Sequence, residues 1–313
     1  MENAIEVENL KKYYGDVKAV KGVSFTVKKG TIFGMLGPNG AGKTTTIETI
    51  IGLLDKTDGR STVLGMDTER ELAEIKKKTG VQLQNPSLFP RLTVRETLAL
   101  FASFYPDPLD ITRAASQVGL EPSFETQIDS LSGGQKHRLA VALALVSNGD
   151  IVFLDEPTTG LDPKARQDLW GVITDLRDRG ITVFLTTHYM DEAEKLCDRL
   201  VIIDRGEIIA RGSPKELIDE NFPHRAIEFT DPGFTEEERA ELKKINEAGS
   251  VNFEENEGRV ILYSETVAAT FDELFAFTQK LDKPLDDLSI RTATLDDVFL
   301  KLTGRGIEED EKA

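Results

Sequence analysis

Residues 31–54, with the sequence TIFGMLGPNGAGKTTTIETIIGLL, constrain the fold more than any other part of the chain. A short apolar run leads into a glycine-rich turn, and a segment typical of a helix follows. The turn matches the pattern G-x-x-x-x-G-K-[ST] at Gly37, Gly42, Lys43 and Thr44. Glycines let backbone N–H groups converge on a phosphate, and the N-terminal end of the next helix attracts the same anion. The segment therefore predicts a strand, a loop and a helix that bind a nucleotide.

The residue types in this turn predict which groups bind the phosphates. The Lys43 ammonium can reach the β- and γ-phosphates, which makes Lys43 both a binding and a candidate catalytic residue, and the Thr44 hydroxyl can coordinate Mg²⁺. We call residues 37–45 the phosphate loop. The nucleotide-binding residues expected in it are Gly37, Pro38, Asn39, Gly40, Ala41, Gly42, Lys43, Thr44 and Thr45.

A second segment, DIVFLDEP at residues 150–157, places two carboxylates at the end of a predicted strand. Its unbroken apolar run is typical of a central parallel strand that is covered by helices on both faces. Ligands of such sheets bind at the carboxyl ends of the strands, so we expect Asp155 to lie beside the phosphates and to hold Mg²⁺ through water. Glu156 follows, and its carboxylate can orient and partly deprotonate the attacking water. An isolated Asp-Glu pair is more often surface charge, but the phosphate loop upstream favours the functional interpretation.

A third strand is predicted at residues 181–185, and His188 comes just after its carboxyl end. A lone histidine is more often structural than catalytic. Of the three histidines, His137, His188 and His224, only His188 follows a strand at the edge where the phosphates are expected. Its imidazole could contact the γ-phosphate and the attacking water, so His188 is a candidate catalytic residue.

These motifs, in this order, resemble those of the nucleotide-binding subunit of an ABC transporter. The resemblance covers residues 5 to about 218 and includes GVQLQNPSLFP around Gln84, LSGGQ at residues 131–135, LDEPTTGLD and LKKYYGD. The combination of LSGGQ with LDEPTTGLD is close to diagnostic of that family. The resemblance implies an α/β fold with a P-loop NTPase core, which consists of a RecA-like core, an antiparallel β subdomain and a helical subdomain that carries LSGGQ.

The resemblance also implies the substrate and the roles of further residues. The nucleotide would be ATP, hydrolysed with Mg²⁺ as cofactor. Tyr14 would stack on the adenine and Val20 would pack nearby. Gln84 would join Thr44 and Asp155 at the metal.

The resemblance further implies a dimer in which two chains share each ATP. The LSGGQ signature of one chain would cap ATP on the phosphate loop of the other, and Asp162 in the loop TGLD would help to carry information between the two sites. The signature residues are Leu131, Ser132, Gly133, Gly134 and Gln135. Because the chain holds one copy of each motif, we expect a homodimer or a heterodimer with a paralogous cassette.

The net charge of −17 argues against a nucleic-acid partner, because such proteins need local positive charge. Residues 222–313 hold 22 Asp and Glu against 11 Lys and Arg, and this shift in composition marks a domain boundary. We predict an ABC ATPase domain at residues 1–221 and a small α+β domain at residues 222–313. The ending ATLDDVFLKLTGRG resembles the appended domain of daunorubicin-resistance-type exporter ATPases, which implies a dimer-stabilising or regulatory role.

The sequence predicts no membrane span, because no apolar run approaches the roughly 18 residues that a bilayer requires. The N-terminus lacks the pattern of a signal peptide, and the single cysteine, Cys197, fits a reducing compartment. We therefore expect a cytoplasmic ATPase, peripheral on the cytoplasmic face of the cell membrane, that powers a separate integral membrane permease, an exporter by its C-terminal resemblance. The alternative is a soluble, non-transport ABC ATPase of the DNA repair or translation type.

Overall fold

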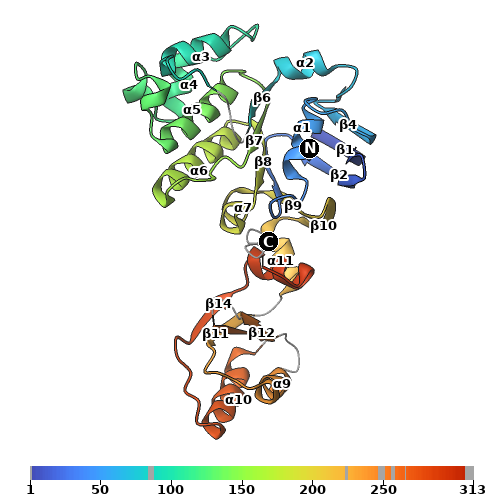
Figure 1. Ribbon diagram of the computed structural model, residues 1–313, viewed down its shortest axis with the longest axis vertical. Helices are drawn as coiled ribbons and strands as arrows, with labels where there is room; N and C mark the ends of the chain where they lie inside the picture. Colours follow the sequence, from blue (N-terminus) through green and yellow to red (C-terminus); the bar gives the residue numbers. More distant parts are fainter. Residues whose placement is uncertain are drawn as a thin grey trace. The chain divides into compact units, whose positions relative to one another are not determined.

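The structure is a computed structural model that describes residues 2–83, 88–222, 225–245, 251–254, 258–264 and 266–306. It contains two compact units, one extending to Pro214 and the other from Lys215 to Gly306, and each is described by itself (Figure 1). Helix α8 (Pro214–Asn221) begins at this division. The boundary predicted from the sequence, after Asn221, is at the other end of the same helix.

A six-stranded sheet forms the centre of the first unit. Its order is β10-β9-β3-β8-β7-β6, with parallel pairing from β9 to β6 and one antiparallel edge strand, β10. The strands are β3 (Ile32–Leu36), β6 (Thr79–Gln82), β7 (Ile151–Asp155), β8 (Thr182–Thr187), β9 (Arg199–Asp204) and β10 (Glu207–Gly212). Every residue of β3, β7 and β8 is buried, as expected for parallel strands covered on both faces. The carboxyl ends of these three strands meet at one edge of the sheet.

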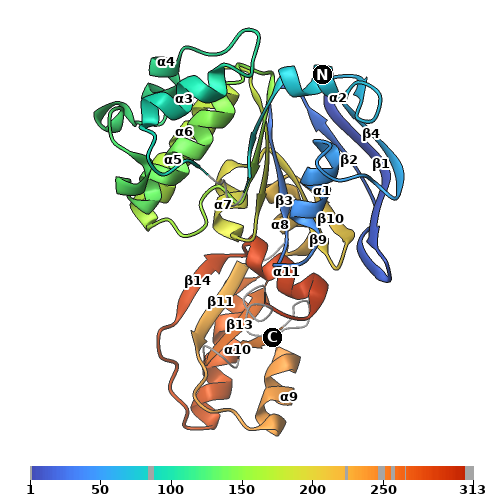
Figure 2. The ribbon, with the colours of Figure 1, turned by 45° about the horizontal axis from the view of Figure 1, so that its top comes forward.

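An antiparallel sheet of order β2-β1-β4-β5 packs on one side of this core. Its strands are β1 (Asn3–Tyr14), β2 (Val17–Lys28), β4 (Asp58–Val63) and β5 (Met66–Asp67), and α2 (Leu72–Lys77) follows. Figure 2 shows α1 (Lys43–Ile50) between the two sheets. Apolar residues of α1 join both sheets in one core, in which the rings of Phe25 and Phe33 stack at 5.4 Å. This core fixes where α1 begins and therefore where the phosphate loop lies.

Helices α5 (Gly133–Leu145), α6 (Pro163–Asp178) and α7 (Met190–Leu196) cover the other side of the six-stranded sheet, and α3 (Val94–Ala102) and α4 (Ile111–Gln117) pack on α5 (Figure 2). Helices α3 and α5 each begin with a capping box, formed by Thr93 with Glu96 and by Ser132 with Gln135. The RecA-like core, the antiparallel β subdomain and the helical subdomain that the sequence predicts are confirmed.

The second unit is a small α+β sandwich. After α8 it contains β11 (Arg225–Thr230), α9 (Glu236–Ile245), β12 (Val251–Glu254), β13 (Arg259–Ser264), α10 (Val267–Lys280), β14 (Ser289–Thr292) and α11 (Leu295–Thr303). Its sheet is antiparallel with the order β12-β13-β11-β14, the order of a β-α-β-β-α-β ferredoxin-like fold. Residues of α9 and α10 pack with the sheet in one apolar core. The predicted small C-terminal α+β fold is therefore present.

Close packing of α5 on the sheet gives a first prediction. A Cβ at Gly80 of β6 would lie 2.0 Å from the carbonyl oxygen of Ala144 in α5, whereas a Cβ at Gly171 of α6 meets nothing within 4 Å. Gly80→Ala should destabilise the first unit by about 1–3 kcal/mol through overpacking. The control Gly171→Ala should stabilise α6 by about 0.5–1 kcal/mol. Urea unfolding followed by the emission of Trp170, the single tryptophan, measures both. Equal changes in the free energy of unfolding for the two substitutions would contradict the close packing of α5 on β6.

Candidate active site

The phosphate loop connects the end of β3 to the start of α1, and its glycines are required by close backbone contacts. A Cβ at Gly37 would lie 2.2 Å from the carbonyl oxygen of Ile203, and a Cβ at Gly42 would lie 2.5 Å from that of Ala19. Gly42 also has φ at +105°, in the left-handed region that favours glycine. Any larger residue would push the loop away from the sheet. The loop can therefore keep its shape only with these glycines.

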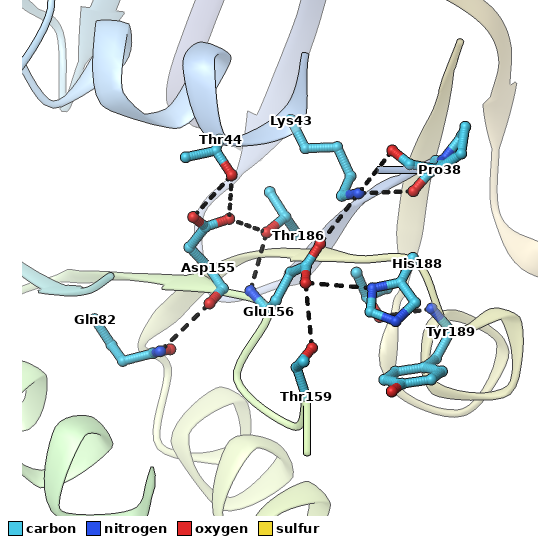
Figure 3. A network of polar contacts seen from close by, with 12 residues as sticks. Pro38, Lys43, Thr44, Gln82, Asp155, Glu156, Thr159, Thr186, His188 and Tyr189 are labelled. Carbon is cyan, nitrogen blue, oxygen red and sulfur yellow. Dashed lines mark hydrogen bonds and ion pairs between the residues drawn. The ribbon is translucent and has the colours of Figure 1, made fainter. Parts of the chain in front are cut away.

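Lys43 is the first residue of α1, and it is buried with only 4% of its surface exposed. Its Nζ donates hydrogen bonds to the carbonyl oxygens of Gly37 at 2.7 Å and Pro38 at 3.0 Å. The same Nζ lies 3.1 Å from Oε1 of Glu156, and Figure 3 shows the ion pair. The ammonium therefore lies between the backbone of the phosphate loop and the carboxylate of Glu156.

Asp155 ends β7 and is 1% exposed. The hydroxyl of Thr44 donates to its Oδ2 at 3.0 Å, and the hydroxyl of Thr186 donates to its Oδ1 (Figure 3). Burial raises the pKa of Asp155, and the two hydroxyls oppose that shift. The carboxylate of Asp155 and the hydroxyl of Thr44 therefore lie together, as the sequence predicts for the metal ligands.

Glu156 has φ at +48°, which is uncommon for a residue other than glycine. Its N–H donates to the carbonyl oxygen of Thr186 at 3.2 Å and to the hydroxyl of that residue at 3.1 Å, and these bonds hold the strained turn. The turn directs the carboxylate toward Lys43, and the hydroxyl of Thr159 donates to its Oε2 at 3.2 Å. Burial disfavours the charged form of Glu156, but His188 and Lys43 outweigh it and lower the pKa to about 2.

His188 follows β8 and lies beside Glu156. Its Nδ1 is 3.3 Å from Oε2 of Glu156, which is an ion-pair distance without the alignment of a hydrogen bond. The ring of Tyr189 is 4.0 Å away, centroid to centroid (Figure 3). The three candidate catalytic side chains, Lys43, Glu156 and His188, thus form one continuous cluster at the carboxyl edge of the sheet.

The residues at this edge fit a magnesium ion. Mg²⁺ prefers oxygen ligands, and in nucleotide sites it is held by one or two protein groups together with the phosphates. Asp155 and Thr44 supply such oxygens. Across the described part of the chain, no group of three or more His, Cys, Asp or Glu could hold a metal by itself. The third predicted metal residue, Gln84, lies outside the described residues.

The signature residues form the start of α5, on the other side of the six-stranded sheet from α1 (Figure 2). The hydroxyl of Ser132 accepts a hydrogen bond from the N–H of Gln135, and Leu131 is buried just before them. Nothing lies within 4 Å of a Cβ built on Gly133, and Gly134 meets only the side chains of Ala165 and Leu161. Helix α5 packs against β6 and β7, whereas α1 packs against β1, β2, β4 and β7.

The structure also describes three other residues for which the sequence predicts a role, Tyr14, Val20 and Asp162. Tyr14, at the end of β1, is 46% exposed, and the Lys12 ammonium lies 4.9 Å above its ring. Val20 is fully buried beneath Gly42. Asp162 is the N-cap of α6, where its Oδ1 accepts from the N–H of Ala165 at 2.9 Å. The Tyr14 side chain is therefore partly open to solvent, with the Lys12 ammonium over its ring.

Sequence reasoning missed Thr186 and Thr159, which contact the two carboxylates. The signal for Thr186 was present, since a polar residue near the end of the buried run ITVFLTT stands at the carboxyl edge of the sheet. Thr159 follows Glu156 by three residues, and nothing in its spacing distinguishes it from the adjacent Thr158.

A P-loop nucleotide site beside paired carboxylates at the end of a parallel sheet defines an NTPase of the P-loop class. Residues 20–159 match the family model described as ABC transporter. The chain is 37% identical to the Nod factor export ATP-binding protein I of Burkholderia orbicola, over 97% of this chain and 98% of that protein. It is 34% identical to the linearmycin resistance ATP-binding protein LnrL of Bacillus subtilis, over 97% of this chain and all of that protein.

Solved structures agree with these relatives. The cassette MJ1267 in its ADP conformation has a TM-score of 0.62 and 29% identity, covering 69% of this chain and 93% of that one. The dimeric bacterial ABC transporter cassette MJ0796 has a TM-score of 0.62 and 28% identity, covering 67% of this chain and 98% of that one. The chain therefore belongs to the ABC transporter family and has the ATP-binding cassette of its ATPases. Among the described residues, no helix is both long and apolar enough to span a bilayer.

The lowered pKa of Glu156 gives a second prediction. Because this pKa is about 2 in the folded chain against an ordinary 4.5, ionised Glu156 stabilises the fold above pH 4.5, and this contribution is lost as the pH falls toward 2. Glu156→Gln should lower the free energy of unfolding at pH 7 by about 1–3 kcal/mol. The difference from wild type should stay constant down to about pH 5 and narrow below it. Urea unfolding of both proteins at pH 7, 5 and 3.5 measures this difference in the free energy of unfolding. A difference that grows as the pH falls would contradict the lowered pKa of Glu156.

Proposed function

We propose that this chain is the Mg²⁺-dependent, ATP-hydrolysing subunit of an ABC transporter and powers a separate integral membrane permease. The observation that carries this proposal is the buried cluster of Lys43, Glu156 and His188 beside the Thr44–Asp155 pair. A chain that only bound nucleotide would need the lysine and the loop, but not a carboxylate held in front of them. The cluster thus supports hydrolysis rather than binding alone.

Each side chain has a distinct task in the hydrolysis that we propose. Lys43 neutralises charge on the phosphates. Thr44, together with Asp155 acting through water, would hold Mg²⁺, which would stabilise negative charge on the phosphate oxygens when bound. Glu156 orients a water molecule in line with the γ-phosphate and accepts its proton as the water oxygen bonds to phosphorus and the bond to the ADP oxygen breaks. Lys43 contacts Oε1 of Glu156, and His188 lies beside Oε2 and helps to hold the carboxylate in position. Gln84 completes the metal environment in this proposal.

We further propose that two chains enclose each ATP between them. The signature begins α5, so the Ser132 hydroxyl and the N–H groups of Gly133 and Gly134 are available at a helix N-terminus, where an anion is favoured. A site of this kind on the far side of the sheet from its own phosphate loop suits the loop of a second chain. The solved MJ0796 cassette is dimeric, which supports the same arrangement here. The partner is a second copy or a paralogous cassette.

Transport out of the cell is the direction that we propose. The relatives named for Nod factor export and linearmycin resistance match this chain along nearly its whole length, including the C-terminal α+β unit. The chain would lie on the cytoplasmic face of the membrane and bind the permease there. Residues 222–313 would serve as an accessory domain that stabilises the dimer or regulates it. The alternative, a soluble DNA repair or translation ATPase, is disfavoured by this full-length similarity and by the net charge of −17.

Mixing two inactive variants tests hydrolysis and the shared site together. Lys43→Ala removes the phosphate-loop ammonium, and Ser132→Arg places a bulky side chain where the γ-phosphate must dock. Each variant alone should hydrolyse ATP at least about tenfold more slowly than wild type. A heterodimer of the two has one site with both defects and one site with none, so a mixture should recover activity, measured as phosphate release.

The control is a mixture of Lys43→Ala with the double variant Lys43→Ala/Ser132→Arg, which contains no intact site and should stay inactive. Full activity of Ser132→Arg alone would refute the shared site. A wild-type chain that fails to hydrolyse Mg-ATP under any condition would refute the proposed function itself.

A further inference from the structure

Helices α6 and α7 are joined by three side-chain contacts that the hydrolysis cluster does not use. The Arg166 guanidinium of α6 lies 4.3 Å from the ring centroid of Tyr189, and its NH1 lies 3.5 Å from Oδ2 of Asp191 in α7. One turn further along α6, the indole Nε1–H of Trp170 donates to Oε1 of Glu192 at 3.0 Å. Arg166 and Asp191 are partly open to solvent, so the contact between Trp170 and Glu192 is the most enclosed of the three.

Glu192 is a carboxyl group with no exposed surface, and no cation is paired with it in the described part of the chain. Burial raises its pKa, and the nearby hydroxyls of Thr187 and Thr158 and the indole of Trp170 oppose that shift. Its second oxygen, Oε2, has no hydrogen-bond partner among the described residues. A leucine would fill this space without the cost of desolvating a carboxyl group. The contribution of Glu192 is therefore the polar contacts of its carboxyl group, among them the hydrogen bond from Trp170, and not its volume.

The bond joins α6 to α7, the helix that begins at the candidate active site. Helix α7 begins directly after His188 and Tyr189, so its position sets where the imidazole lies relative to Glu156. Helix α6 follows its N-cap Asp162, the residue expected to help carry information between the two sites. A rigid link between the two helices would hold His188 at its distance of 3.3 Å from Glu156.

We propose that Trp170 and Glu192 are positioning residues for ATP hydrolysis, and that their hydrogen bond fixes α7 against α6 so that His188 stays in place beside Glu156. This inference rests on the proposed function, because it assigns the two residues to the hydrolysis step. Neither residue touches the phosphate loop, so both should act on turnover and leave nucleotide affinity alone.

Three variants separate the hydrogen bond from packing. Trp170→Phe removes the N–H and keeps an aromatic ring, Glu192→Leu removes the acceptor and keeps the volume, and Glu192→Gln keeps an acceptor oxygen. Trp170→Phe and Glu192→Leu should lower kcat for Mg-ATP by about tenfold, because a small displacement of an active-site group costs one to two orders of magnitude in rate. Glu192→Gln should stay within about twofold of wild type. The Kd for Mg-ADP, by calorimetry, should be unchanged in all three.

Measuring the effect of Trp170→Phe on hydrolysis with and without His188 distinguishes a positioning role from a general effect on stability. In a His188→Ala background, measured in single turnover, Trp170→Phe should cause less than about a twofold further loss, since the group that it positions is absent. The emission maximum of Trp170, the single tryptophan, should shift in Glu192→Leu and not in Glu192→Gln.

Two results would overturn the inference while leaving the proposed function intact. One is a tenfold loss from Trp170→Phe that persists in the His188→Ala background, and the other is full activity in Glu192→Leu. If Trp170→Phe does not fold, or if hydrolysis in the His188→Ala background is too slow to measure, the inference is tested by comparing the kcat of Glu192→Leu with that of Glu192→Gln. Equal kcat in that pair refutes the inference. A wild-type chain without ATPase activity would instead refute the proposed function.

Discussion

The ion pair between Lys43 and Glu156 is the interaction on which the site depends, because it joins the phosphate loop to the carboxyl end of β7. Both side chains are 4% exposed, and a buried charge is tolerated only when it is paired and hydrogen-bonded. Lys43 meets this condition through two carbonyl oxygens of its own loop, and Glu156 meets it through Thr159 and the proximity of His188. The pair holds the Lys43 ammonium and the proposed general base, Glu156, 3.1 Å apart, with both side chains almost fully buried.

The rest of the first unit supports this pair by fixing three strand ends. Close approach of the loop to Ile203 on β9 sets its position, and the Thr186 hydroxyl on β8 contacts both the carboxylate of Asp155 and the backbone N–H of Glu156. The left-handed backbone at Glu156 costs about 1–3 kcal/mol, and it turns the second carboxylate away from the first. One carboxylate can therefore serve the metal while the next serves the water.

Much of this arrangement could be predicted because it is encoded in short, local patterns. The glycine spacing of the phosphate loop, the apolar run before Asp155 and the position of His188 each follow from residues that are adjacent in the sequence. The sequence predicts the third strand at residues 181–185, and it extends over Thr182–Thr187 because Thr186 and Thr187 continue the parallel pairing with β3. Thr159 and the bond between Trp170 and Glu192 could not be predicted, since each depends on how separate segments pack. Gln84 lies outside the described residues, so its role stays a prediction.

The mass of the particle in solution shows most directly whether two chains hold ATP between them, as we propose. Glu156→Gln should bind Mg-ATP and keep it, because the amide cannot accept the proton of the water. Light scattering after gel filtration should then show one chain without nucleotide or with Mg-ADP, and two chains with Mg-ATP. Adding Ser132→Arg to this variant should abolish the ATP-dependent dimer. If the Glu156→Gln chain binds Mg-ATP but has the same mass with and without it, ATP is not held between two chains.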